Sequence, residues 1–178
     1  TLEYLGDGVN ASAETLGALT ITAGSNTIKA TAGSGGTAAL TFASLAAPAK
    51  GTGMNFVTNT GGSIILTGAT DTNGILDAHL YYNGADFASG SAVTAATYTV
   101  ENTGTSLLAA NGTPYLVNTV DIAAQATAII NAGIKFNDTR NLTLGAAQTL
   151  TIQNGAGSVS GGILVTGGTV GTPVGVTI

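Results

Sequence analysis

Leu19-Thr20-Ile21-Thr22 shows the pattern on which the fold prediction rests, because its mixture of apolar and threonine residues recurs along the chain. Short runs of β-branched and apolar residues with partial alternation are typical of β-strands. The gaps between the runs hold Gly, Ser, Asn and Asp, which favour turns. The sequence therefore predicts an all-β protein of short strands. The other runs of this kind are Ala39-Leu40-Thr41-Phe42, Ile64-Ile65-Leu66-Thr67, Leu142-Thr143-Leu144, Leu150-Thr151-Ile152 and Val174-Gly175-Val176-Thr177-Ile178.

The arrangement of these strands follows from the size of the side chains. No helical stripe alternates with the strands, which argues against an α/β fold. Of 178 residues, 27 are Gly, only four are Phe and five are Tyr, and Trp is absent. Small residues suit the narrow interior of a parallel β-helix, whereas a β-sandwich core usually holds more large aromatic residues. We therefore expect residues 1–178 to form a single β-solenoid domain, with coils of roughly 20–30 residues. A β-sandwich is the alternative.

Four segments give local expectations. Residues 16–23 are expected to form one strand, and Leu40 and Phe42 to point inward from a later one. Asn83-Gly84 predicts a tight turn, because both residues tolerate positive φ. Residues 123–130 are ambiguous between a strand and a short helix.

The charge of the chain excludes one class of function. The net charge is −5, and charged residues make up 7%, against roughly 25% in an average soluble protein. Nucleic-acid binding needs a cluster of cations to neutralise phosphates, so we exclude it. The absence of Cys excludes disulfides and thiolate metal sites. No run approaches the roughly 18 apolar residues of a membrane-spanning helix. The four basic residues are Lys29, Lys50, Lys135 and Arg140.

A family resemblance rests on a longer pattern. Residues 14–21 lead into 26–31 and 39–45, and residues 130–137 lead into 148–152 and 160–168 in the same manner. This pattern resembles the large secreted bacterial proteins built from autotransporter-associated β-strand repeats. The resemblance implies a β-helical stalk or passenger region that is exported and displayed on the bacterial cell surface. It implies no catalytic residues, and it suggests one unit of a longer or polymeric array.

The densest group of oxygen ligands gives a calcium hypothesis. Asp71, Asn73 and Asp77 lie close together in the sequence, and Ca²⁺ takes six to eight oxygen ligands. The segment has no Glu at the twelfth position of an EF-hand loop, and turn chemistry also explains Asp and Asn here. No other cofactor is expected.

Two further groups of residues are candidate sites. Asp77 and His79 could orient an imidazole for base catalysis. No nucleophile accompanies them, so we expect the protein not to be an enzyme. Tyr81, Tyr82 and Asp86 could instead bind glycans along one face, as in an adhesin. Adjacent tyrosines point to opposite faces of a strand, so only one of them joins such a strip.

The two ends of the chain give the leading hypothesis. Both are apolar strands without a polar cap, and solenoid ends normally need caps because they expose backbone and core. We therefore expect these ends to stack on identical subunits or adjacent repeats, forming an extracellular fibre, stalk or filament. The predicted assembly residues are Leu2, Tyr4, Leu5, Val174, Val176 and Ile178.

Overall fold

The computed structural model describes residues 1–101, 113–138, 140–153 and 161–166. These residues form seventeen strands and no helix. Parallel sheets stack into a β-solenoid of about six turns, which confirms the predicted fold over the sandwich. Contacts within the chain define two compact units, and each is described by itself below. The prediction of one continuous segment over residues 1–178 stays a prediction.

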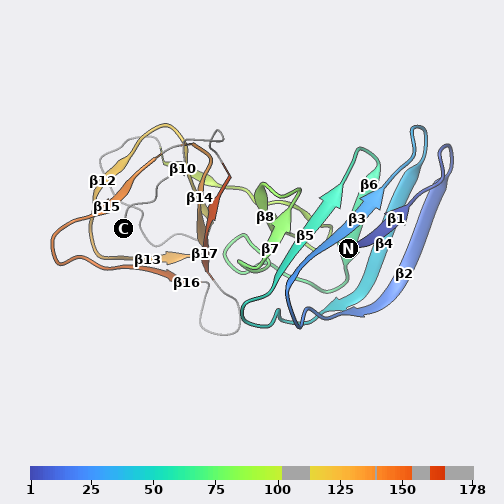
Figure 1. The fold of residues 1–178 in the computed structure, drawn as a ribbon, viewed down its shortest axis with the longest axis horizontal. Helices are drawn as coiled ribbons and strands as arrows, with labels where there is room; N and C mark the ends of the chain where they lie inside the picture. The colour runs from blue at the N-terminus through green and yellow to red at the C-terminus, as the bar shows by residue number, and fades with distance from the viewer. Residues whose placement is uncertain (102–112, 139, 154–160, 167–178) are drawn as a thin grey trace. The chain divides into compact units, whose positions relative to one another are not determined.

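The first unit comprises Thr1–Asp71 and His79–Ala95 and is built from two sheets (Figure 1). Its strands are β1 (Leu2–Leu5), β2 (Ala11–Leu19), β3 (Ser25–Thr31), β4 (Thr37–Leu45), β5 (Gly53–Thr58), β6 (Gly62–Leu66), β7 (Leu80–Tyr82), β8 (Asp86–Ser89) and β9 (Thr94–Ala95). One sheet has the order β1-β3-β5-β7-β8-β9, and the other has the order β2-β4-β6. From β1 to β6 the chain alternates between the two sheets, so each of these three coils contributes one strand to each, whereas β7, β8 and β9 all belong to the first sheet.

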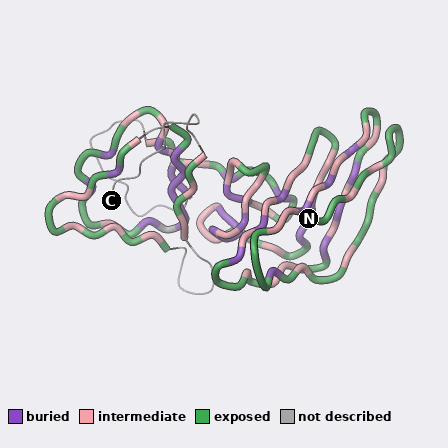
Figure 2. The backbone as a smooth tube through the Cα atoms, viewed as in Figure 1, coloured by how far each residue is buried: buried purple, intermediate pink, exposed green. Residues whose placement is uncertain are grey.

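Parallel register stacks the apolar residues of successive coils into ladders. Leu2 pairs with Ile28, and Ile28 pairs with Phe56, so successive coils take 26 and 28 residues. Ile28 and Phe56 are buried, and buried positions alternate along β3 to β6 (Figure 2). In the other sheet Phe42 pairs with Leu66, and both are buried. Leu40 and Phe42 therefore point inward, as predicted.

The turns of the first unit pack so closely that glycine is required. A Cβ on Gly62 would overlap the carbonyl oxygen of Ala30 in the coil below. A Cβ on Gly36 would overlap the carbonyl oxygens of Asp7 and Asn10. These turns stack backbone against backbone, which only a residue without a side chain allows.

The second unit comprises Thr72–Ala78 and Ala96–Ile178, and its described coils use three short sheets. The sheets have the orders β10-β11-β14-β17, β12-β15 and β13-β16, all parallel. The strands are β10 (Thr99–Glu101), β11 (Tyr115–Val117), β12 (Ile122–Gln125), β13 (Ala128–Asn131), β14 (Gly133–Phe136), β15 (Leu142–Leu144), β16 (Leu150–Gln153) and β17 (Gly162–Val165). Its buried core consists of Tyr115, Val117, Ile122, Ile130, Ile134, Phe136 and Leu142.

Two local expectations are resolved by these strands. Residues 123–130 are not helical: they complete β12 and lead into β13, with Ile122 and Ile130 fully buried. The strand expected over residues 16–23 was placed wrongly, because β2 spans Ala11–Leu19. Its register is fixed by pairing with β4, which sets Leu16 beside Phe42. Alternation within residues 16–23 is a weaker, purely local signal than that pairing.

Candidate functional site

The N-terminal edge of the first unit carries half of the predicted assembly residues. Leu2 and Tyr4 pair with Ile28 and Ala30, which are core residues. No described strand covers Leu2 and Tyr4 from the other side, and Leu2 remains 42% exposed. Leu5 is 67% exposed and pairs with Thr31, on the opposite face of β1. Leu2 and Tyr4 thus continue the core ladder to an open edge, whereas Leu5 does not.

Strand β2 forms the second half of this open edge. Among the described residues, β2 pairs with β4 alone over Ala11–Leu19. Leu16 stands in register with Phe42 and extends the core ladder. Glu14 stands in register with Leu40, which pairs in turn with Ile64. Leu40 and Ile64 are buried, so a carboxylate occupies the last position of an otherwise apolar ladder.

The opposite edge of the first unit is closed by antiparallel strands. Asn83-Gly84 turns the chain with φ of 50° and 68°, which confirms the predicted tight turn. Strand β8 then pairs antiparallel with β7. In the other sheet, the amide of Leu66 donates to the carbonyl of Ser91 at 2.7 Å, and the amide of Val93 donates to that of Ile64 at 2.9 Å. Both sheets are therefore paired at this edge.

Asp71 holds the closing segment in place. Its carboxylate accepts hydrogen bonds from the Ser89 hydroxyl at 2.6 Å and from the Gly90 amide at 2.8 Å. Of the other calcium candidates, Asn73 and Asp77 are grouped with the second unit, and Asp77 is buried. Within the described ranges, no three His, Cys, Asp or Glu side chains gather as a metal site would require. The calcium hypothesis stays a prediction.

The tyrosines weighed for glycan binding contact other residues of the first unit. Tyr81 stacks on Phe87, with 6.3 Å between ring centroids. The Tyr82 hydroxyl lies 2.7 Å from that of Thr58. Both tyrosines are half-buried, and Asp86 pairs with Tyr82 across the hairpin. These contacts account for the aromatic residues as packing, and the glycan hypothesis stays a prediction.

The pair weighed for catalysis does not share a strand. Asp77 and His79 both precede β7, which begins at Leu80. The carbonyl of His79 accepts a hydrogen bond from the Met54 amide at 2.9 Å, so its backbone continues the sheet pairing of β5. Neither Asp77 nor His79 therefore lies on a strand. The expectation that the protein is not an enzyme stays a prediction.

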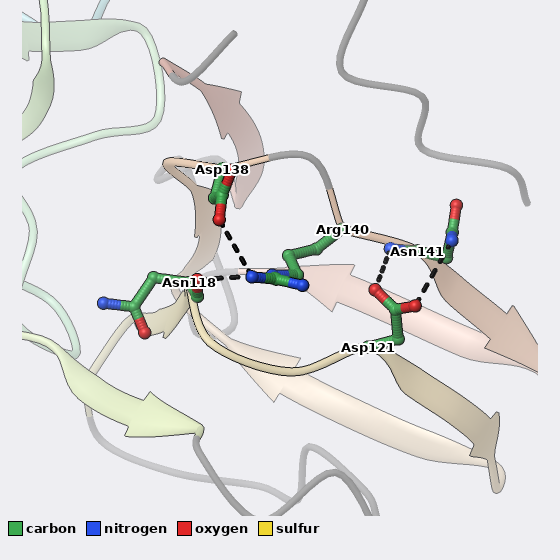
Figure 3. Close-up of polar contacts among 5 residues, drawn as sticks. All are labelled: Asn118, Asp121, Asp138, Arg140 and Asn141. Carbon is green, nitrogen blue, oxygen red and sulfur yellow. Dashed lines mark hydrogen bonds and ion pairs between the residues drawn. The ribbon is translucent and has the colours of Figure 1, made fainter.

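The second unit contains a polar corner that was not predicted from the sequence (Figure 3). Arg140 forms an ion pair with Asp138 at 2.9 Å and donates from Nε to the carbonyl of Asn118 at 3.3 Å. Asp121 accepts from the amide of Asn141 at 2.9 Å. The corner after β11 is thereby tied to the corner after β14. An exposed ion pair is worth only about 0–1 kcal/mol, so these contacts, called the clamp below, link the two corners with little gain in free energy.

Lys135 is a second basic residue with a structural position. It is buried on β14, and its Nζ lies 5.3 Å from the centroid of the Tyr98 ring. This is a cation–π contact. This contact could not be predicted from the sequence, because Tyr98 and Lys135 lie on separate coils.

Asp7 lies at the open edge, in the turn before β2, where backbone amides bind its carboxylate. Its carboxylate accepts hydrogen bonds from the amides of Val9 at 2.8 Å and Asn10 at 3.0 Å. These bonds, that of Val9 first, hold the pKa of Asp7 below its usual value of 3.8. The group is fully exposed, so it shapes the turn before β2 rather than a chemical site.

The remaining predicted assembly residues, Val174, Val176 and Ile178, lie outside the described residues. The part of the chain that the structure describes contains no helix that could cross a membrane. Comparisons with protein-family models, curated proteins and solved structures give no match to this chain.

Proposed function

We propose that this protein is a structural building block, a β-solenoid that stacks end to end into an extracellular fibre, stalk or filament on a bacterial surface. The observation that carries the proposal is the open edge formed by β1 and β2. Leu2, Tyr4 and Leu16 there continue core ladders but have no described neighbour above them. Covering such an edge removes apolar surface from water and pairs free backbone groups, and both favour association.

The remaining parts of the proposal rest on the sequence. Location outside a bacterial cell is supported by the resemblance to autotransporter-associated β-strand repeats. The partners are identical subunits or adjacent repeats of the same kind. The proposal assigns no catalytic chemistry and no cofactor to the chain.

The test is the association of the purified chain over a range of concentrations, measured by sedimentation and electron microscopy. Leu2→Asp places a charge on the open core ladder and is expected to weaken association at least about tenfold. Ile129→Asp is the matched control, because Ile129 is similarly exposed at 48% but lies on β13 of the second unit. A purely monomeric protein at every concentration and pH, or equal effects of both substitutions, would contradict the proposal.

A further inference from the structure

Glu14 is placed where an added strand would bury it. It ends the ladder formed with Leu40 and Ile64, which are 1% and 0% exposed. Any strand that pairs with β2 and extends the sheet covers this position. Burying an ionised carboxylate without a partner is strongly unfavourable. A charge that points inward on an edge strand is one way in which natural sheets prevent unwanted pairing.

The surroundings of Glu14 offer it no counter-charge. The element packed against β2 is β4, and Thr37–Leu45 contains no titratable side chain. The other ionisable groups of the first coil are Glu3, Tyr4, Asp7 and the terminal amine of Thr1, and the first basic side chain in the sequence is Lys29. Lys29 stands in register with Glu3 on β1, whereas the residue in register with Glu14 is the apolar Leu40. Two Glu14 carboxylates that are brought close together repel each other while they are ionised.

The other edge of the same two sheets shows which kind of strand they accept. There β8 pairs antiparallel with β7, and Val93 and Ser91 pair with β6 in the same sense. Antiparallel addition is thus compatible with these parallel sheets, as in many mixed sheets.

Strand β2 is suited to antiparallel pairing with itself. It has nine residues with Thr15 at the centre, so pairing about Thr15 overlaps the full length of both copies. That register places Glu14 of each copy opposite Leu16 of the other. Ala13 and Gly17 then face each other on the outer surface, where neither is bulky. An interface in which the same patch serves both partners is the commonest form of self-association.

We propose that β2 is a joint for a second copy of this chain, paired antiparallel about Thr15, and that Glu14 keeps the joint open until its carboxylate is protonated. The inference rests on the proposed function, since it specifies one of the contacts by which the units stack. Each joint takes up two protons, one for each Glu14. Linkage then gives a rise in the association constant of up to about 100-fold for each pH unit that the solution is acidified.

The first experiment compares the wild type with Glu14→Gln by sedimentation at pH 7 and pH 4. Glu14→Gln is expected to associate at least about tenfold more tightly than the wild type at pH 7. At pH 4 the wild type is expected to approach the variant, which itself changes little. Glu3→Gln is the control, because Glu3 lies on the same edge but pairs with the half-buried Lys29 rather than with a core residue. An equal gain from Glu3→Gln would overturn the role of Glu14.

The second experiment locates the joint with a single cysteine, which is unambiguous because the chain has none. In the Glu14→Gln background at pH 7.5, Thr15→Cys is expected to form a disulfide-linked dimer. Residues directly opposite each other in an antiparallel pair have Cα atoms about 4.5–5.5 Å apart, within disulfide range. Thr41→Cys is the control, because Thr41 is the neighbour of Thr15 on the interior strand β4. Association of Glu14→Gln without this crosslink would mean another occupant or register and would overturn the joint.

The outcomes separate this inference from the proposed function. Association that is the same for the wild type and Glu14→Gln at both pH values would overturn the gate and leave end-to-end stacking intact. Absence of association in both proteins at both pH values would overturn the two together. Thermal melting of each variant at low concentration checks that the substitutions leave the fold unchanged.

Discussion

The two units reach the same solenoid fold with different turn chemistry. The first unit has two sheets with strands of up to nine residues, and its turns stack glycine against backbone. The second has three short sheets with strands of three or four residues in its described coils. More sheets per coil mean more corners per coil, and side chains hold those corners. Asp121 accepts from the amide of Asn141, and Gln148 accepts from that of Thr127 at 2.7 Å.

A solenoid can therefore hold its coils together in two ways. Close backbone stacking tolerates no added atom, because protein interiors are packed like crystals. Side-chain hydrogen bonds at an exposed corner tolerate loss better, because water can replace them. The glycines that meet backbone, among them Gly36 and Gly62 in the first unit and Gly161 in the second, should therefore be the positions most sensitive to added volume. The second unit should lose less when a single corner residue is removed.

The largest effect is expected from Gly62→Ala in the first unit. The new Cβ would overlap the carbonyl oxygen of Ala30 and lie 2.9 Å from Oδ1 of Asn59. Because backbone must move to relieve this overlap, we expect a loss of about 3 kcal/mol in the free energy of unfolding. Urea denaturation measures it. Gly17→Ala is the control, since its Cβ would meet no atom within 4 Å, and it should change stability by less than about 0.5 kcal/mol. Equal losses would refute close stacking as the cause.

The parts of the fold that could be predicted are those marked by a pattern within a single segment of the sequence. The alternation around Leu40 and Phe42 and the Asn83-Gly84 turn are local signals, and both predictions are confirmed. The prediction of a strand over residues 16–23 was wrong, because the register between coils is set by a partner strand 26 residues away. A shift of register changes which residues reach the core. For that reason the position of Glu14 on the core ladder could not be predicted.

The candidate site was predictable only in part, for the same reason. Leu2 and Tyr4 were found because an apolar strand without a cap is visible in one segment. The clamp of Arg140 and Asp121 was missed because Arg140 and its acceptor Asn118 lie 22 residues apart. Nothing in either segment alone indicates that their corners stack. Residues that meet only through coil stacking can be predicted only if the coil length is known. In the sheet of β10, β11, β14 and β17 that length varies from 16 residues between Thr99 and Tyr115 to 29 between Ile134 and Ile163.

The second-largest effect comes from comparing the loss of hydrogen bonds to a buried backbone with the loss of a hydrogen bond to an exposed amide. Asn59 accepts from the amide of Ala32 and donates to its carbonyl, each at 2.8 Å, and Ala32 is 5% exposed. Asn59→Ala leaves both buried groups without this partner, so we expect a loss of about 2 kcal/mol. Asp121→Ala in the second unit should cost only about 0.5–1 kcal/mol, because the exposed amide of Asn141 can bind water.

Denaturation gives both values, and hydrogen exchange at the Ala32 amide reports the lost bond directly. A larger loss for Asp121→Ala than for Asn59→Ala would reverse the ranking and show that the corners of the second unit are the more critical ones.

The smallest effect is expected on the stability of the fold at acid pH, through Asp7 at the open edge. Hydrogen bonds from Val9 and Asn10 lower the pKa of Asp7 in the folded protein. A group whose pKa is lower when folded stabilises the fold above its unfolded pKa, and this contribution disappears as the pH falls through the folded pKa. The contribution of Asp7 should therefore be present at pH 5 and above and be lost below about pH 4. Asp7→Asn should flatten that part of the profile.

The measurement is the difference between the urea midpoints of the wild type and Asp7→Asn from pH 6 to pH 2. Other carboxylates titrate in both proteins, so only the difference reports Asp7. The protein must be dilute enough to stay monomeric, because acid is also expected to promote pairing through β2. A difference that stays constant over this range would mean that the turn before β2 does not depend on the charge of Asp7. The geometry of that turn would then rest on its close backbone stacking against Gly33 and Gly36.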